Sequence, residues 1–331
     1  MADNKGDEYK DGIKIIDVGQ LSGRLNRMFK TTLRVYKKAV ELDADIYHLH
    51  DPELIPIGLK LKRLRKKVIF DAHEDLPRQL LSKSYLGPMT AQVLSAATSL
   101  LERYACRRLD GIIGATPFIR DKFMTINPYT VDVNNFPLIG ELGAAVPWTE
   151  KRDEVCYVGG IAAIRGIREL VRACEFLRSP ARINLAGRFS EPAVEAEVKA
   201  YQGWSRVNEL GFLDRAGVRN VLGRSVAGLV TLHPISSYLD ALAVKMFEYM
   251  SAGIPVIASN FPLWREIVEG NECGLCVDPL DPKAIAAAID HLVKNPDTAR
   301  RMGENGCQAV LSKYNWSIEE KKLHAFYRKL L

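Results

Sequence analysis

The chain has no long apolar run and few cysteines. The first absence argues against a membrane-spanning protein, and the second argues against a fold held by disulfides. No stretch among its 331 residues approaches the roughly 20 apolar residues of a membrane span. No secretory leader opens it. The cysteines are scattered without a disulfide framework or zinc-site spacing, at Cys106, Cys156, Cys174, Cys273, Cys276 and Cys307. We therefore expect a cytoplasmic protein with reduced thiols.

The composition is that of a soluble protein with two cores, since 47% of the residues are hydrophobic and 26% are charged. Residues 20–70 hold a net excess of positive charge. Five basic residues recur at helical spacing there: Arg24, Arg27, Lys30, Arg34 and Lys38. This pattern fits either a solvated helix face or peripheral contact with the anionic inner face of the membrane. No recognition motif accompanies the charge, so we expect no nucleic-acid partner.

Short apolar runs alternate with longer amphipathic ones, which predicts parallel sheets flanked by helices in an α/β protein. In the first half we expect strands at 13–18, 46–49, 68–70, 111–115 and 130–134, and helices near 22–43, 53–65, 88–108 and 117–124. In the second half we expect strands at 154–158, 181–185, 207–210, 227–231 and 256–259, with a terminal helical region at 296–331.

Residues 233–266 are the most informative stretch. They predict a loop, a helix over 241–252, a Gly-Ile-Pro break and a buried strand. Asp240 stands where the N-cap of that helix would lie. Glu248 would then follow about 12 Å along the same helix, at ~1.5 Å per residue. This separation is too long for a shared metal or proton, but it suits the two ends of one extended ligand. The free amides at the helix start would face a diphosphate in its middle.

A second motif joins a strand to a helix through Gly159, Gly160 and Arg165. Glycines at this place let the backbone approach a phosphate closely. Arg165 can donate a forked, charge-assisted contact to a diphosphate. Lys245 can supply a second cation, although it is also explained as an ordinary surface lysine.

These motifs together resemble the acid-x7-acid helix and glycine loop of the family 4 retaining glycosyltransferases of GT-B fold. The resemblance implies two Rossmann-like domains that face a cleft. It also implies that Asp240 contacts the donor sugar and Glu248 the ribose. Two departures are visible: the first acid is Asp240 where the family usually has Glu, and Gly160 replaces the first basic residue of the loop.

The same resemblance assigns further site residues. It implies a catalytic set of His73, Asp240, Arg165 and Lys245. It implies donor-binding positions at Gly159, Gly160, Arg165, Gly187, Arg188, Gly211, Phe212, Leu213, Lys245 and Glu248. Acceptor-side candidates are His50 and Glu74. Asp71 and Asp75 are potential metal ligands, but such enzymes typically work without a metal, so we expect none.

The resemblance also implies domain limits: an N-terminal domain of residues 1–137 with 316–331, and a donor domain of 138–315. Roughly 40 residues that usually open the first domain, about one strand-helix-strand unit, have no counterpart here. We expect an unpaired sheet edge in consequence, which favours self-association, such as a homodimer.

The expected function is transfer of a sugar from a UDP- or GDP-linked donor to a lipid-linked or saccharide acceptor in surface-polysaccharide assembly. The nucleotide sugar is a substrate, and no cofactor is expected. Two alternatives remain open: a nucleotide-sugar 2-epimerase of the same fold, and a non-catalytic nucleotide-sugar-binding protein.

Overall fold

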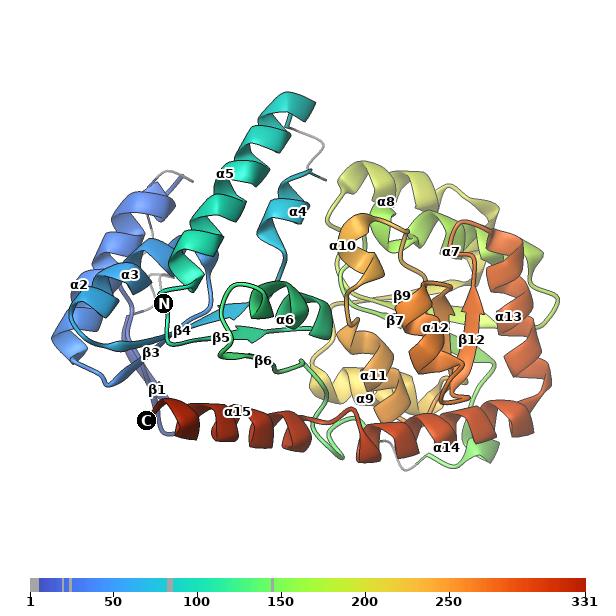
Figure 1. Ribbon diagram of the computed structural model, residues 1–331. Helices are drawn as coiled ribbons and strands as arrows, with labels where there is room; N and C mark the ends of the chain where they lie inside the picture. The colour runs from blue at the N-terminus through green and yellow to red at the C-terminus, as the bar shows by residue number, and fades with distance from the viewer. Residues whose placement is uncertain (1–5, 20, 24–25, 82–85, 144–145) are drawn as a thin grey trace. The chain divides into compact units, whose positions relative to one another are not determined.

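The computed structural model describes residues 6–19, 21–23, 26–81, 86–143 and 146–331 (Figure 1). The chain forms two compact units: unit 1 is Met1–Val133 with Lys322–Leu331, and unit 2 is Asn134–Lys321. The last helix, α15 (Trp316–Leu330), begins in unit 2 and ends in unit 1. No helix among the described residues has both the length and the apolar character to cross a membrane.

Unit 1 contains a four-stranded parallel sheet with the strand order β3-β4-β5-β6. Its strands are β3 (Ile46–Leu49), β4 (Lys67–Ala72), β5 (Gly111–Gly114) and β6 (Thr130–Asp132). These bounds confirm the four strands predicted between residues 46 and 134. Because all four run in parallel, their carboxyl ends meet at one edge of the sheet.

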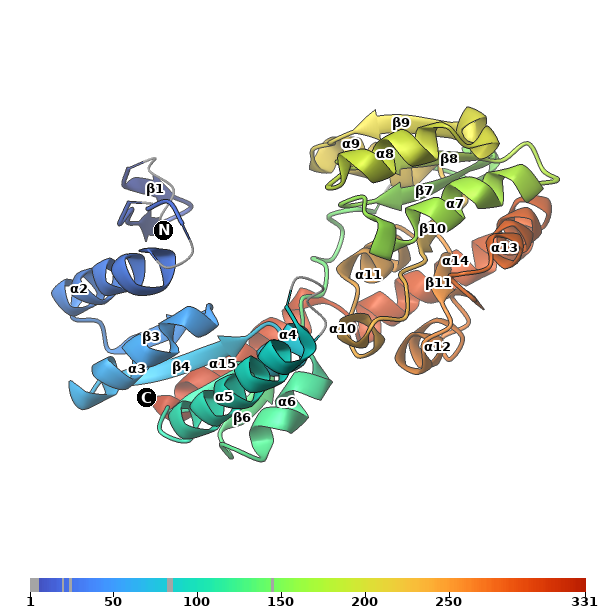
Figure 2. The ribbon, with the colours of Figure 1, turned by 90° about the horizontal axis from the view of Figure 1, so that it is seen from above.

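Helices cover both faces of this sheet. Unit 1 contains α2 (Thr32–Leu42), α3 (Ile55–Arg63), α4 (Leu76–Leu81), α5 (Pro88–Cys106) and α6 (Pro117–Met124). On one face, α3, α5 and α6 enclose the larger core. On the other face, Phe326 and Leu330 of α15 pack against Ile69 and Ile113 (Figure 2). A Cβ at Gly111 would lie 2.4 Å from the Phe326 ring, so this glycine lets α15 approach β5.

The predicted strand at 13–18 is confirmed only at 13–15, and it does not join the parallel sheet. Residues Ile13–Ile15 form β2, which pairs antiparallel with β1 (Glu8–Lys10) in a separate two-stranded sheet. The turn between them has positive φ at Asp11 (50°) and Gly12 (80°). Asp-Gly is the favoured pair for such a tight hairpin turn. The Asp-Gly turn therefore directs residues 13–15 to pair with β1 in a hairpin, and they do not join a parallel sheet.

The expected helix at 22–43 is shorter in the structure, with a π-helical turn η1 (Arg27–Thr31) leading into α2. Arg24 lies outside the described residues. Two members of the predicted basic face are ion-paired, Arg27 with Glu53 at 3.0 Å and Lys38 with Glu41 at 2.7 Å. The charge of this face is therefore partly neutralised within the chain.

Unit 2 contains a six-stranded parallel sheet with the order β12-β11-β10-β7-β8-β9. Its strands are β7 (Glu154–Val158), β8 (Arg182–Ala186), β9 (Val207–Gly211), β10 (Ala227–Val230), β11 (Val256–Ser259) and β12 (Gly274–Val277). The five strands predicted here are confirmed to within one residue at each end. Alternate strand residues enter two separate cores, which shows that the sheet is buried on both faces.

The helices of unit 2 divide between the two faces of its sheet. They are α7 (Ile167–Ala173), α8 (Pro192–Lys199), α9 (Arg215–Arg224), α10 (Ser236–Leu239), α11 (Val244–Ser251), α12 (Pro262–Val268), α13 (Pro282–Lys294) and α14 (Pro296–Ser312). One core contains residues of α7, α8 and α13, and the other contains residues of α9, α11 and α12 (Figure 2). The carboxyl edge of the sheet is left to the loops.

The helix predicted over 241–252 is confirmed over 244–251, but it begins three residues later than expected. Asp240 ends α10, and α11 begins at Val244 after an extended residue, Ala243 (φ −69°, ψ 107°). The indole Nε1 of Trp264 donates to the Ala241 carbonyl oxygen at 2.7 Å. This contact ties that carbonyl to α12 instead of to a helical amide. Asp240 is therefore not the N-cap of α11, and helical rise does not relate it to Glu248.

All six cysteines are free, and most are buried. Burial raises the pKa of the thiols of Cys106, Cys156, Cys174 and Cys273 to about 12. Cys273 and Cys276 lie before and within β12, which agrees with a turn and a short strand rather than a metal pair.

Candidate functional site in unit 2

Three glycines end adjacent strands at the carboxyl edge of the unit 2 sheet. Gly159 follows β7, Gly187 follows β8 and Gly211 ends β9. A Cβ at Gly187 would lie only 1.9 Å from the Gly159 carbonyl oxygen. The Gly187 amide donates to the Gly211 carbonyl oxygen at 2.8 Å. The turns thus stack backbone on backbone, and a residue with a side chain could not take the place of Gly187.

Arg165 lies in the loop that follows the first of these turns. It ends a short 3-10 turn, η4 (Ala163–Arg165), and its Nη1 donates to the Gly160 carbonyl oxygen at 3.1 Å. The next residue, Gly166, has φ +79°, and a Cβ there would lie 2.0 Å from the Thr231 carbonyl oxygen. The loop therefore returns closely against β10, with the guanidinium beside the glycine turn.

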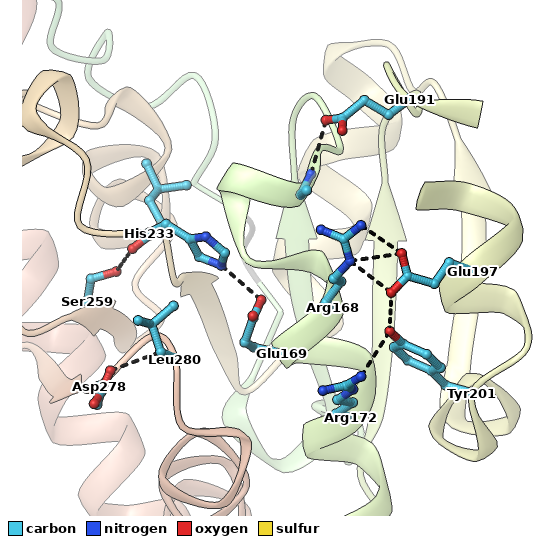
Figure 3. A network of polar contacts seen from close by, with 12 residues as sticks. Arg168, Glu169, Arg172, Glu191, Glu197, Tyr201, His233, Ser259, Asp278 and Leu280 are labelled. Carbon is cyan, nitrogen blue, oxygen red and sulfur yellow. Dashed lines mark hydrogen bonds and ion pairs between the residues drawn. The ribbon is translucent and has the colours of Figure 1, made fainter. Parts of the chain in front are cut away.

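Three residues that no sequence motif identified hold this loop in place (Figure 3). Glu191 accepts a hydrogen bond from the Ala163 amide at 3.2 Å. His233, which follows β10, lies 2.9 Å from Glu169 of α7. Each contact joins segments far apart in the sequence, so only the fold could reveal it. The sequence does place His233 just after a predicted strand, at the start of the 233–266 stretch, and this position is the signal that points to it.

Lys245 extends from the first turn of α11 toward the glycines. Its Nζ lies 3.8 Å above the centroid of the Tyr157 ring. A Cβ at Gly159 would be 3.2 Å from the same Nζ. The Nζ is buried and makes no hydrogen bond within the part of the chain that is described. A buried ammonium without an acceptor is costly, so this arrangement suits a site that an anion completes.

The environment of Lys245 changes its protonation. Burial, followed by the positive charge of Arg165, lowers the pKa of Lys245 from 10.5 to about 7. Glu248 acts in the opposite direction but does not compensate. The side chain as a whole is only half-buried, but its charged Nζ is fully buried. Desolvation of that atom governs the shift.

Glu248 lies on α11 but pairs with another element. Its carboxylate is 2.7 Å from Arg215, the first residue of α9, and Arg215 also pairs with Glu141 at 2.7 Å. These residues line a groove of about 380 Å³ together with Phe136 and Val244. The Glu141 and Glu248 contacts hold the pKa of Arg215 above its usual range. In this structure Glu248 is thus neutralised by an arginine.

The remaining expected donor-site residues gather after β8 and β9. The Arg188 guanidinium stacks over the Phe212 ring at 5.0 Å from its centroid. Phe212 is 69% exposed, so a large apolar ring is presented to solvent at the sheet edge. Leu213 follows it and precedes Asp214, whose side chain caps α9. Stacking surfaces and free backbone groups of this kind suit a nucleobase.

In unit 1, His50 and His73 follow the adjacent strands β3 and β4. His50 Nδ1 lies 3.3 Å from His73 Nε2 and 3.3 Å from Asp71 Oδ2. Burial opposes ionisation of Asp71, but the imidazoles of His48 and His50 outweigh it and hold the pKa of Asp71 well below its usual range. The Asp71 contact raises the pKa of His50. Glu74 is exposed and accepts a hydrogen bond from Gln79.

Unit 2 therefore gathers glycine turns and two cations at one edge of a doubly wound sheet. Gly159 and Gly187 give close backbone approach, and Arg165 and Lys245 give positive charge. Within the described residues, neither cation has a carboxylate at ion-pair distance. Ligands of such sheets bind at the carboxyl ends of the strands. This geometry defines an α/β protein of doubly wound parallel sheets.

Comparison with protein families agrees with that class and narrows it. Residues 141–309 match the model of the glycosyl transferases group 1, and residues 3–132 match that of Glycosyltransferase Family 4. The chain belongs to the group 1 glycosyltransferases, with the GT-B fold.

Curated relatives are transferases of several kinds. The chain is 26% identical over 185 residues to the alpha-D-kanosaminyltransferase of Streptomyces kanamyceticus, covering 55% of this chain and 47% of that protein. It is 25% identical over 276 residues to the alpha-maltose-1-phosphate synthase of Mycolicibacterium smegmatis, covering 74% and 70%. The chain thus spans about half the length of the first of these relatives.

Solved structures share the fold. The sucrose-phosphate synthase of Thermosynechococcus elongatus superposes with a TM-score of 0.78 at 21% identity, covering 99% of this chain and 86% of that chain. The HepE protein of Anabaena, solved with UDP-glucose, gives a TM-score of 0.72 at 14% identity, covering 93% and 84%.

Proposed function

We propose that this glycosyltransferase moves a hexose or N-acetylhexosamine from a UDP- or GDP-linked donor, with retention of the anomeric configuration. The acceptor would be lipid-linked or a saccharide, in the assembly of a surface polysaccharide. The observation that carries the proposal is the buried Lys245 Nζ, which has no hydrogen-bond acceptor among the described residues and lies beside the glycine turns. HepE, whose structure holds UDP-glucose, supports a nucleotide-sugar donor.

In the proposed mechanism, unit 2 holds the nucleoside diphosphate. Arg165 and Lys245 neutralise the charge that develops as the diphosphate leaves, assisted by the amides at the start of α11. Among the described residues no side chain caps that helix start, and the Met246 amide already donates to the Ala243 carbonyl oxygen, so the amides of the two residues before it would serve a phosphate. Preorganised donors of this kind are worth about 3–4 kcal/mol each in the transition state. The diphosphate then needs no divalent cation.

The other residues take the roles that the motif assigns. The backbone at Gly211–Leu213 and the exposed Phe212 ring would contact the base, and Glu248 the ribose. Ribose binding by Glu248 requires its carboxylate to share or leave Arg215. Asp240 and His73 would contact the transferred sugar. Departure of the diphosphate leaves an oxocarbenium-like sugar, which the acceptor hydroxyl attacks from the same face.

Turnover tests the proposal. Donors that raise the melting temperature are selected from a panel of UDP- and GDP-sugars and offered with lipid-linked and oligosaccharide acceptors. We expect a glycoside with the donor's anomeric configuration by NMR, and activity that survives EDTA. Conversion of free UDP-GlcNAc without an acceptor would instead identify an epimerase. Nucleotide binding without any turnover would identify a non-catalytic protein.

Variants of the two site cations, with a buried lysine elsewhere in unit 2 as the control, test the diphosphate site. Each charge-assisted contact contributes about 1.5–3 kcal/mol. Lys245→Met and Arg165→Ala should therefore each weaken UDP or GDP binding by roughly 10- to 150-fold. Lys151 is the control, because its Nζ donates to the Gly223 and Ser225 carbonyl oxygens at 2.8 and 2.9 Å. Lys151→Met should leave nucleotide affinity unchanged. Equal affinity in all variants would exclude the diphosphate role.

A further inference from the structure

Unit 1 brings three imidazoles and one carboxylate together at the carboxyl edge of its sheet. His48 lies in β3 and His50 directly follows that strand, whereas Asp71 lies in β4 and His73 follows it. The two strands are neighbours in parallel register, with His48 opposite Ile69 and Leu49 opposite Phe70. The pairing therefore places a His-x-His segment beside an Asp-x-His segment.

The donor atoms of this cluster are spaced as a metal ion requires. Asp71 Oδ2 lies 3.3 Å from His48 Nε2 and 3.3 Å from His50 Nδ1. His48, His50 and Asp71 each offer a ligand atom within 4.8 Å of the other two. Around a tetrahedral Zn²⁺ with bonds of about 2.0–2.1 Å, neighbouring ligand atoms lie about 3.3–3.4 Å apart. The stacked rings of His48 and His50, with 4.4 Å between their centroids and 20° between their planes, must turn so that both lone pairs meet the ion.

His48 is held as a metal-ligating histidine usually is. Its Nδ1 lies 2.6 Å from the hydroxyl of Tyr327 on α15. Its Nε2 is buried and has no hydrogen-bond partner of acceptable geometry among the described residues, although Asp71 is close. When the Tyr327 hydroxyl accepts a hydrogen bond from Nδ1–H, Nε2 carries no proton. Its lone pair is then free to bind a metal ion. Histidine ligands of metals commonly donate their second ring N–H in this way.

We propose that His48, His50 and Asp71 bind a divalent transition-metal ion, for which Zn²⁺ is the best chemical match. Imidazole nitrogens favour such ions over Mg²⁺ and Ca²⁺, which prefer oxygen ligands. The fourth position is open to water, and His73 Nε2 lies 3.3 Å from His50 Nδ1 at its side. This site lies in unit 1. The proposal departs from the sequence-based expectation that the chain holds no metal, and the titration below decides between them.

Metal titration of the purified 331-residue chain tests the site without reference to sugar transfer. The protein is first treated with a chelator, and Zn²⁺ binding is then measured by calorimetry. Co²⁺ serves as a second probe, since its visible absorption reports nitrogen and oxygen ligands in tetrahedral geometry. We expect one Zn²⁺ per chain, no competition from Mg²⁺, and an intense Co²⁺ band.

Variants separate the cluster from ordinary surface histidines. His50→Gln removes an exposed side chain, so the fold should persist, and Zn²⁺ affinity should fall at least 100-fold. Tyr327→Phe should weaken binding by about 10-fold, as expected for a residue that orients a ligand. His291→Gln, at an exposed histidine of unit 2, should change nothing. Zn²⁺ binding that is absent from the parent chain, or unchanged by His50→Gln, would overturn the proposal and leave a histidine–aspartate ion pair.

Discussion

Replacing Lys245 with methionine should abolish the uptake of a proton that otherwise accompanies donor binding. In the free protein, burial and then the charge of Arg165 lower the pKa of Lys245 to about 7. A bound diphosphate would place negative charge beside the same Nζ and restore the charged form. Binding at a pH above 7 must then draw one proton from the buffer.

The expected size follows from the structure. A drop from 10.5 to about 7 corresponds to about 5 kcal/mol, at 1.36 kcal/mol per pKa unit. At pH 8 only about a tenth of Lys245 would be protonated in the free protein, so binding should take up roughly 0.9 proton. At pH 6 the lysine is already charged, and the uptake should be about 0.1.

Calorimetry in two buffers of different ionisation enthalpy measures this number directly. UDP-glucose, or another nucleotide sugar that the thermal-shift panel selects, is the right ligand because its doubly esterified diphosphate does not titrate in this range. Lys151→Met is the control, since burial also lowers the pKa of Lys151, to about 8, but its Nζ is already hydrogen-bonded. It should retain the uptake that Lys245→Met loses. The reasoning is refuted if wild-type protein takes up no proton at pH 8, or if Lys245→Met takes up as much.

Three further outcomes are expected. Because the pKa of Lys245 is lower in the folded chain, the unfolded chain binds more protons between pH 7 and 10.5. This contribution makes unfolding free energy rise with pH there in wild-type protein and is missing in Lys245→Met, by urea denaturation. Gly187→Ala should destabilise the chain by about 1–3 kcal/mol and weaken nucleotide binding, because its Cβ would meet a carbonyl oxygen at 1.9 Å. Thermal melts measure the loss of stability. Gly143→Ala is the control, since a Cβ there meets nothing within 4 Å. Glu248→Gln should weaken UDP binding more than Arg215→Met does; equal losses by calorimetry would mean that Glu248 acts only through its ion pair.

The strands of both sheets could be predicted because each is a short apolar run between polar segments. Parallel strands that are buried on both faces leave this pattern whatever their partners are. The hairpin at the start could also have been found. Asp11-Gly12 is a strong local pattern for a tight turn between two strands.

The break before α11 could not be predicted from local sequence. Residues 241–243 are Ala, Leu and Ala, which favour a helix. A contact from Trp264, more than twenty residues away, takes up the Ala241 carbonyl oxygen. Asp240 suits either end of a helix, since short polar side chains favour both caps and turns. Tertiary contacts therefore decided the boundary.

The sequence identifies the glycines and cations of the candidate site. It does not show which charged groups are buried or which of them form ion pairs. Motif spacing identified Gly159, Arg165 and Lys245. Nothing in the sequence indicates that the Lys245 Nζ is buried without an acceptor, or that Glu248 pairs with Arg215. The histidine cluster depends on the register between β3 and β4, which strand patterns alone do not fix.

The buried cysteines allow the local unfolding of each unit to be measured separately. Cys106 is buried in unit 1, and Cys156 and Cys174 are buried in unit 2. A thiol whose pKa is near 12 is almost entirely protonated at neutral pH and alkylates slowly. Pulsed alkylation followed by mass spectrometry would therefore give two opening equilibria from one sample, and a nucleotide sugar held by unit 2 should slow the labelling of Cys156 and Cys174 only.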